Sequence, residues 1–426
     1  MLGGEKVPLS LSRRGRDSTL SMVDDIICVS ECGFQSVMLN SYLTCKTNMK
    51  KLQFGAGKCK KMHIGKKHEE FRCHAIFVDE WEETEKKDII EDMCVGKVKM
   101  EESEEEKYLG DIITKDGRNI KNIQSRVNKG KGIVKRITEI LDGVPFGKLY
   151  FQVAIILRNS LLVSSVLCNS ETWFNLTKSE LDLLETVDLL LLRTILGAQK
   201  TVPKEMLYLE LGVIPLREMI RQRRLNFLHY ILKQDKESIL FKVFEAQNKN
   251  KNRKDWVTSV TQDLEELELD VTFETIQKMG KEKWRNTVKN IIKLKSFRKL
   301  EKIKETHSKV KNISYLRLEM QDYLMPNDVE KMNKDEVKMI FKIRCRMLNI
   351  KMNMKNQYDT FTCLVCLNED ETQKHVYECK EILKLNNKKH SEIPEYEEIF
   401  SGNVHKKVKI ARILEENLKI RDSKIS

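Results

Sequence analysis

Residues 181–196 read LDLLETVDLLLLRTIL, and this stretch decides the fold class. Its apolar side chains extend over several helical turns, which is longer than an ordinary buried strand. The segment from Tyr150 to Cys168 has the same character. Gly197 and Gly212 follow such segments and supply the residue type that commonly ends a helix. The sequence therefore predicts long core helices in the middle of the chain.

Composition excludes several classes of protein. The 426 residues suggest about two or three domains at roughly 150 residues each. Hydrophobic residues make up 40%, enough for packed cores, so a fully disordered chain is excluded. No stretch approaches the roughly 20 consecutive apolar residues of a membrane helix, and the start lacks the apolar core of a signal peptide. We expect an intracellular protein without a membrane partner, in either the nucleus or the cytoplasm.

Positive charge is concentrated in two segments. The chain carries 77 lysines and arginines against 64 acids, a net charge of +13. Residues 278–311 hold 13 of these cations against three glutamates, and residues 119–172 hold eight against three acids. Such segments suit a polyanion, although runs of charge are also typical of solvated helix faces, and Trp284 fits either base stacking or a core. The candidate nucleic-acid-binding residues are Arg126, Lys129, Lys131, Lys135, Arg136, Lys289 and Lys293.

Three of the eleven cysteines lie close together near a histidine. Cys363 and Cys366 form a C-x2-C pair, and His375 and Cys379 follow as H-x3-C after eight further residues. Zinc binds four such ligands in a tetrahedron, and His375 and Cys379 would share one face of a helix. The alternative is buried free thiols beside a surface histidine. We favour zinc with a structural or nucleic-acid-binding role, because four protein ligands leave no position open for catalysis.

An acidic pair lies between two short apolar runs near the start of the chain. Asp24 and Asp25 follow Met22-Val23 and precede Ile26-Ile27, which predicts a hairpin with both carboxylates at its tip. Paired carboxylates can hold Mg²⁺ for phosphoryl transfer. An Asp-Asp pair is also common in a solvated turn. Tyr108–Thr114 is expected to be another strand, and Val37–Leu52 a helix.

Several short motifs are spread along the chain between Met22 and Gly197. They are Met22-Val23-Asp24-Asp25, Lys58-Cys59-Lys60-Lys61-Met62, Lys107-Tyr108-Leu109-Gly110, residues 161–173 (LLVSSVLCNSETW) and residues 193–197 (RTILG). This series resembles the reverse transcriptases of non-long-terminal-repeat retrotransposons. The first motif is similar to their catalytic aromatic-x-Asp-Asp hairpin, with Met in the aromatic position. Cys168-Asn169 stands where the family has Tyr-Gly in its thumb pattern.

The resemblance implies roles for particular residues. Asp24 and Asp25 would be catalytic Mg²⁺ ligands, and Lys58 would lie near the incoming deoxynucleotide. Tyr108-Leu109-Gly110 would belong to the primer grip. Glu371–His375 resembles the start of the family's C-terminal zinc knuckle. In the family, a third carboxylate and the fingers lie upstream of the Asp-Asp hairpin, and only 23 residues precede Asp24 here.

We therefore expect an α+β, helix-dominated fold built on a partial reverse-transcriptase palm of antiparallel strands. The expected parts are a disordered start (1–19), the partial palm (20–115), a helical thumb (116–200), a helical basic region (201–350), a CCHC zinc knuckle (351–385) and a charged helical tail (386–426). The expected function is that of a truncated transposable-element RNA-directed DNA polymerase, catalytically incomplete but binding RNA and DNA. The alternatives are a zinc-dependent RNA- or DNA-binding protein and a helical interaction protein without catalysis.

Overall fold

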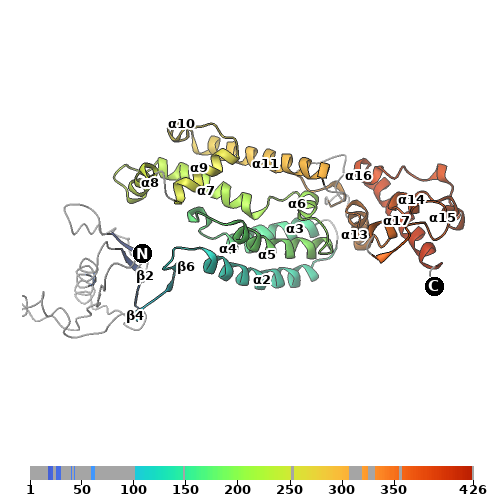
Figure 1. Ribbon diagram of the computed structural model, residues 1–426, viewed down its shortest axis with the longest axis horizontal. Coiled ribbons are helices and arrows are strands. Elements are labelled where there is room, and N and C mark those ends of the chain that lie inside the picture. Colours follow the sequence, from blue (N-terminus) through green and yellow to red (C-terminus); the bar gives the residue numbers. More distant parts are fainter. Residues whose placement is uncertain are drawn as a thin grey trace, which may run out of the picture. The chain divides into compact units, whose positions relative to one another are not determined.

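Helices dominate the computed structural model, and strands are few and short (Figure 1). The structure describes residues 18–22, 25–29, 40, 43, 59–62, 101–146, 149–250, 254–306, 319–324, 332–354 and 357–424. The chain divides into two compact units, residues 1–122 and 123–426. No helix in the described ranges is long and apolar enough to cross a membrane.

The described residues of the first unit form three pairs of short strands. β1 (Ser18–Met22) and β2 (Asp25–Val29) form an antiparallel hairpin in which Met22 pairs with Asp25, so the hairpin expected there is confirmed. β1 begins inside the stretch 1–19 that was expected to be disordered, and the rest of that stretch lies outside the described residues. β3 (Lys60–Lys61) is parallel to β4 (Glu101–Glu102). The helix expected over residues 37–52 is described only at two residues, 40 and 43, both helical.

The third strand pair corrects one expectation. Tyr108–Thr114 is not a single strand, because β5 (Glu105–Tyr108) ends where that stretch begins and β6 (Asp111–Thr114) runs back antiparallel to it. The turn between them places Leu109 at φ 48° and Gly110 at φ 87°. Two consecutive left-handed residues make the tight turn that suits a hairpin, and glycine adopts this conformation without steric cost.

The second unit is a set of packed helices. α2 (Ile120–Asp142) leads into this unit. α3 (Tyr150–Leu157) continues through a π-helix (Arg158–Val163) into α4 (Ser164–Val166). The helices that follow are α5 (Lys178–Leu196), α6 (Lys204–Leu211), α7 (Leu216–Leu232), α8 (Ile239–Lys249), α9 (Trp256–Glu266), α10 (Phe273–Lys278), α11 (Lys281–Thr306), α13 (Lys334–Arg344), α14 (Gln373–Glu378), α15 (Lys380–Leu385), α16 (Glu398–Ser401) and α17 (Val404–Asp422).

Local sequence explains where these helices begin and end. Thr177 and Glu180 form a capping box at the start of α5, which satisfies backbone N–H groups that lack helical partners. Gly197 and Gly212 follow α5 and α6 at φ 64° and 63°, so both predicted stops are confirmed. A Cβ on Gly212 would lie 2.2 Å from the backbone nitrogen of Met320, so this position also needs glycine for close packing.

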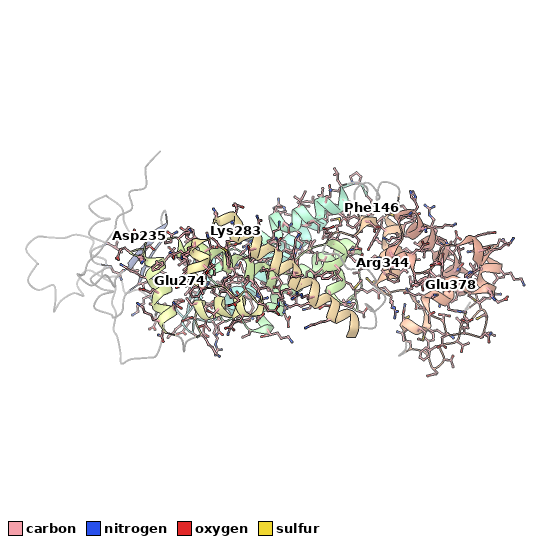
Figure 2. All side chains as sticks on the ribbon, turned by 90° about the horizontal axis from the view of Figure 1, so that it is seen from above. Phe146, Asp235, Glu274, Lys283, Arg344 and Glu378 are labelled. Carbon is pink, nitrogen blue, oxygen red and sulfur yellow. The ribbon has the colours of Figure 1, made fainter. Side chains whose placement is uncertain are left out.

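Two hydrophobic clusters form the core of the second unit. The larger one joins α2, α3, α5 and α6 with α13–α17, and the smaller one joins α7–α11 around Trp284. Buried ion pairs cross the larger cluster. Arg158 donates to Asp188 at 2.7 Å, and Arg344, labelled in Figure 2, donates to Glu210 at 2.9 Å. Burial of these charges is tolerable only because each is paired and hydrogen-bonded.

Candidate metal centre

The four residues predicted as zinc ligands come together in the second unit. The ligand atoms of Cys363, Cys366, His375 and Cys379 all lie within 4.8 Å of one another. The Cys366 Sγ and His375 Nε2 atoms are 3.3 Å apart. Zinc bonds of about 2.3 Å to sulfur and 2.0–2.1 Å to nitrogen place tetrahedral ligands roughly 3.5–3.8 Å apart. The predicted cluster is therefore confirmed as a group that could hold a metal ion, and its donor set suits zinc.

A short hairpin-like loop positions the first two cysteines. The Glu371 N–H donates to the Phe361 carbonyl at 2.7 Å, and the Cys363 N–H donates to the Glu369 carbonyl at 2.7 Å. Leu367, directly after the C-x2-C pair, has φ 55° and donates its N–H to the Cys363 carbonyl at 3.0 Å. This tight turn brings the two sulfur atoms to the same side of the loop.

The histidine and the third cysteine are held by a helix. The Thr372 hydroxyl accepts from the His375 N–H at 3.0 Å and so caps α14. Cys379 follows the last residue of α14 and precedes α15. One turn of helix separates the two side chains, as the spacing predicts.

The protein environment shifts the pKa values of the three thiols in different directions. Burial raises the pKa of Cys379 to about 12 and also raises the pKa of Cys363. Burial would raise the pKa of Cys366 too, but hydrogen bonds from the backbone of Asn368 and Glu369, together with those from Cys363 and His375, lower it to about 7. N–H groups directed at sulfur favour the thiolate, which is the form that binds metal.

An outer carboxylate orients the histidine. Glu369 Oε2 lies 3.1 Å from His375 Nδ1, while His375 Nε2 faces Cys366. A carboxylate on the second ring nitrogen is the usual support of a zinc-binding histidine. Sequence reasoning missed Glu369, since nothing in the ligand spacing singles out one acid of the loop.

Buried hydrogen bonds tie the cluster to the rest of the second unit. Glu371 is fully buried and accepts from the Lys351 N–H at 3.0 Å and from Arg421 Nη1 at 3.3 Å. The Asn417 amide donates to the carbonyls of Val376 and Tyr377 at 3.0 and 3.1 Å. α17, expected as a charged tail, therefore packs against α14 and belongs to the same core (Figure 1).

The predicted phosphate contacts are exposed with one exception. Lys129, Lys131, Lys135, Arg136, Lys289 and Lys293 all lie on the surface of their helices. Arg126 does not, so its assignment to the surface is wrong. It is only 4% exposed, and its Nη1 donates to the Ser165 carbonyl at 3.2 Å, because it lies on the side of α2 that packs against the core.

The aromatic and arginine residues near these helices are structural. Trp284 is fully buried and donates its indole N–H to the Leu225 carbonyl at 2.9 Å, so base stacking by this residue is excluded and the core alternative holds. Arg221 and Arg224 converge on the buried Asp263, at 3.0 and 2.7 Å. The sequence gives no sign of this pairing, because Asp263 lies about 40 residues further along the chain.

The predicted magnesium site is described only in part. Asp25 is the first residue of β2, at the tip of the hairpin. Asp24 and Lys58 lie outside the described residues, and so does the side chain of Asp25.

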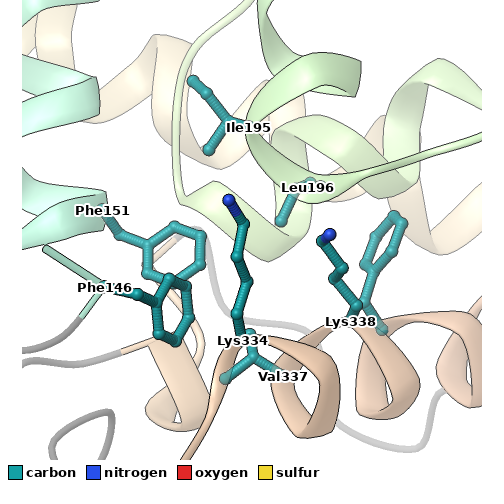
Figure 3. Close-up of a pocket in the computed structure, with 8 residues that line it drawn as sticks. Phe146, Phe151, Ile195, Leu196, Lys334, Val337 and Lys338 are labelled. Atoms are coloured by element: carbon teal, nitrogen blue, oxygen red, sulfur yellow. The ribbon is translucent and has the colours of Figure 1, made fainter. Parts of the chain in front are cut away.

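Two hollows in the described part of the chain are lined by residues other than the predicted zinc ligands. The cavity whose lining residues Figure 3 draws is bordered by Leu196 of α5 and by Lys334 and Lys338 of α13, and it holds about 10 Å³, room for no more than about one water molecule. A larger hollow of about 510 Å³ lies along α17, and its lining includes Val404, Val408 and Arg412.

Known proteins give no independent assignment. No family model, curated protein or solved structure matches the chain.

Proposed function

We propose that this chain is a nucleic-acid-binding protein held together by zinc, with the ancestry of a retrotransposon reverse transcriptase. The observation that carries the proposal is the convergence of Cys363, Cys366, His375 and Cys379 within the unit that also presents the two basic helices, α2 and α11. Closed Cys₃His sites stabilise small modules that bind RNA or DNA. The exposed cations supply sequence-independent attraction to phosphates.

Local backbone features support the proposed ancestry. Asp25 pairs with Met22 in an antiparallel hairpin, and the Tyr-Leu-Gly motif lies at the turn of another. Asn169, which stands where the family has glycine, adopts the left-handed conformation at φ 59°. Asparagine tolerates that conformation better than most residues and so can replace glycine there. In the proposed ancestry, RNA-directed DNA synthesis needs Asp24, Asp25, Lys58 and Mg²⁺, with deoxynucleotides as substrates.

The binding activity is tested with fluorescently labelled RNA and DNA at several salt concentrations. The affinity of the wild type should fall steeply with salt, and the Lys289→Gln and Lys293→Gln substitutions should each reduce the slope of log K against log salt by about 0.9. A matched Lys249→Gln substitution, on α8 rather than on either basic helix, should leave the slope unchanged. Affinity that does not vary with salt would favour a helical interaction protein instead.

The catalytic part of the proposal has its own experiment. Primer extension on an RNA template with Mg²⁺ and deoxynucleotides should be compared between the wild type and the Asp24→Ala, Asp25→Ala double variant. Extension by neither protein is the outcome that agrees with a binding role alone. Synthesis by the wild type that is lost in the variant would mean that this chain supplies the third ligand and is an active polymerase.

A further inference from the structure

α8 buries little of its own apolar surface. The helix packs against α7 and α9, and Phe244 is the only one of its side chains that is buried (Figure 1). The Phe244 ring meets the Phe273 ring edge to face, with 5.4 Å between the ring centroids. Ile239, Leu240 and Val243 are instead 55%, 41% and 50% exposed. α8 is thus fixed to the protein by one side and presents large apolar side chains on another.

The exposed apolar side chains form a row along the helix. A rotation of about 100° per residue places Val243 and Ala246 within about 40° of Ile239, and all three at least about 100° from Phe244. Leu240 lies beside this row. A spacing of four and then three residues is the one by which a helix presents an apolar row to another helix. Ile239, Leu240, Val243 and Ala246, all exposed, are here called the α8 stripe.

No other helix in the described ranges exposes more than one large apolar side chain. The helices that expose a single one are α2, α3, α5, α7, α11 and α15, at Ile140, Ile156, Leu190, Tyr230, Leu294 and Leu385. Single exposed apolar residues are ordinary on a protein surface, whereas neighbouring ones mark an interaction site. The α8 stripe therefore needs an explanation that the isolated residues do not.

Positive charge borders the α8 stripe. Lys242 and Lys249, one heptad apart, follow one edge of the row. Lys242 pairs with Glu237 at 2.7 Å and Lys249 with Glu245 at 3.3 Å, but all four side chains are more than half exposed. Such pairs contribute little in water, so other carboxylates can replace them. Residues 233–254 together hold seven cations against three acids, which favours an acidic partner.

We propose that the α8 stripe docks an amphipathic helix of a partner protein, whose apolar row is flanked by aspartates or glutamates. The partner's apolar row covers Ile239, Val243 and Ala246, and its carboxylates pair with Lys242 and Lys249. A second copy of this chain fits less well, because antiparallel copies would set the two lysine edges against each other. A nucleic-acid backbone would pair with the lysines but leave the apolar row uncovered. This inference is independent of the proposed nucleic-acid binding.

The experiment uses two labelled helical peptides about four heptads long, both with Ile and Leu at the a and d positions. One peptide carries Glu at the e and g positions and the other carries Lys. In titrations followed by fluorescence anisotropy, the Glu peptide should bind the full chain about ten-fold more tightly than the Lys peptide, with an affinity that falls as salt rises. The Lys242→Glu, Lys249→Glu double variant should reverse this preference.

A second variant tests the apolar row without changing charge. Val243→Gln should weaken binding of the Glu peptide about ten-fold, because an apolar contact is lost and an amide is buried in its place. Glutamine favours a helix at least as much as valine does, so α8 should stay folded, and far-ultraviolet circular dichroism verifies this. The matched control is Ile156→Gln, at the single exposed apolar side chain of α3, and it should bind like the wild type.

Each contrary outcome overturns a stated part of the inference. No binding of the Glu peptide, or equal affinity for the two peptides, would overturn an acidic helix as the occupant. Wild-type affinity in Val243→Gln would place the peptide elsewhere and overturn the α8 stripe. Sedimentation of the protein alone tests the competing occupant, since a dimer that is lost in Val243→Gln would assign the stripe to a second copy. Nucleic-acid affinity should be the same in Val243→Gln and the wild type.

Discussion

Loss of a single zinc ligand should destabilise much more than the loop that carries it. The perturbation is Cys363→Ser, and the matched control is Cys168→Ser, the same substitution at a cysteine outside the cluster. Zinc contributes about 10–16 kcal/mol to small closed sites, or about 3 kcal/mol for each of four ligands. Total domain stability is about 5–15 kcal/mol, so loss of one ligand removes a large fraction of it.

The hydrogen bonds around the site determine how far this effect reaches. Glu371 joins the loop to Arg421 at the end of α17, and Asn417 joins α14 to the same helix. Cys363 and Cys379 are buried in the cluster that also contains α13 and α17. We therefore expect loss of zinc to lower the free energy of unfolding of these helices as one cooperative unit, rather than to release the loop alone.

The assay combines metal analysis with urea unfolding followed by far-ultraviolet circular dichroism. The wild type and Cys168→Ser should contain one zinc per chain, and Cys363→Ser should contain less and unfold with a free energy about 3 kcal/mol lower. A chelator should lower the midpoint of the wild type but change that of Cys363→Ser little. Protein that is purified folded and free of zinc, or equal midpoints for the two serine variants, would refute the reasoning.

Three further predictions follow from single contacts. Glu369→Ala should weaken zinc affinity about 10–100-fold without removing a ligand, because His375 loses its outer carboxylate, and competition with a chromogenic chelator measures this. Asn169→Gly should be about 1 kcal/mol more stable than Asn169→Ala, since φ is 59° at this position and both changes remove the same side-chain amide; urea midpoints that place the alanine variant above the glycine variant would contradict the left-handed turn. Burial alone would raise the pKa of Glu218, but its two cationic partners, Arg221 and Lys299, lower it below the ordinary 4.5. A carboxyl whose pKa is lower in the folded than in the unfolded protein stabilises the fold at pH values above the unfolded pKa, and this contribution is lost as the pH falls through the folded pKa. Glu218→Gln should therefore be less stable than the wild type at neutral pH, and the difference should shrink below about pH 4.5.

Local sequence patterns were sufficient for some features of this protein. The apolar stretch from Leu181 to Leu196 predicted a core helix because helical periodicity and length are properties of the segment itself. Gly197 and Gly212 marked helix ends for the same reason, since a left-handed residue closes a helix wherever it occurs. The zinc ligands were found because a metal imposes a fixed spacing on its ligands along the chain.

Contacts between distant segments decided the rest. Arg126 and Lys129 look alike in sequence, yet Arg126 is buried in the core, where it donates to the Ser165 carbonyl, and Lys129 is exposed to solvent. Trp284 is a core residue because it packs against apolar side chains of α7 and donates its indole N–H to the Leu225 carbonyl of the same helix. The residue pattern within a segment determines whether it forms a helix, where that helix ends and which residues can bind a metal together. Whether a charged or aromatic side chain is buried or exposed depends on contacts with distant segments, which only the folded chain brings close.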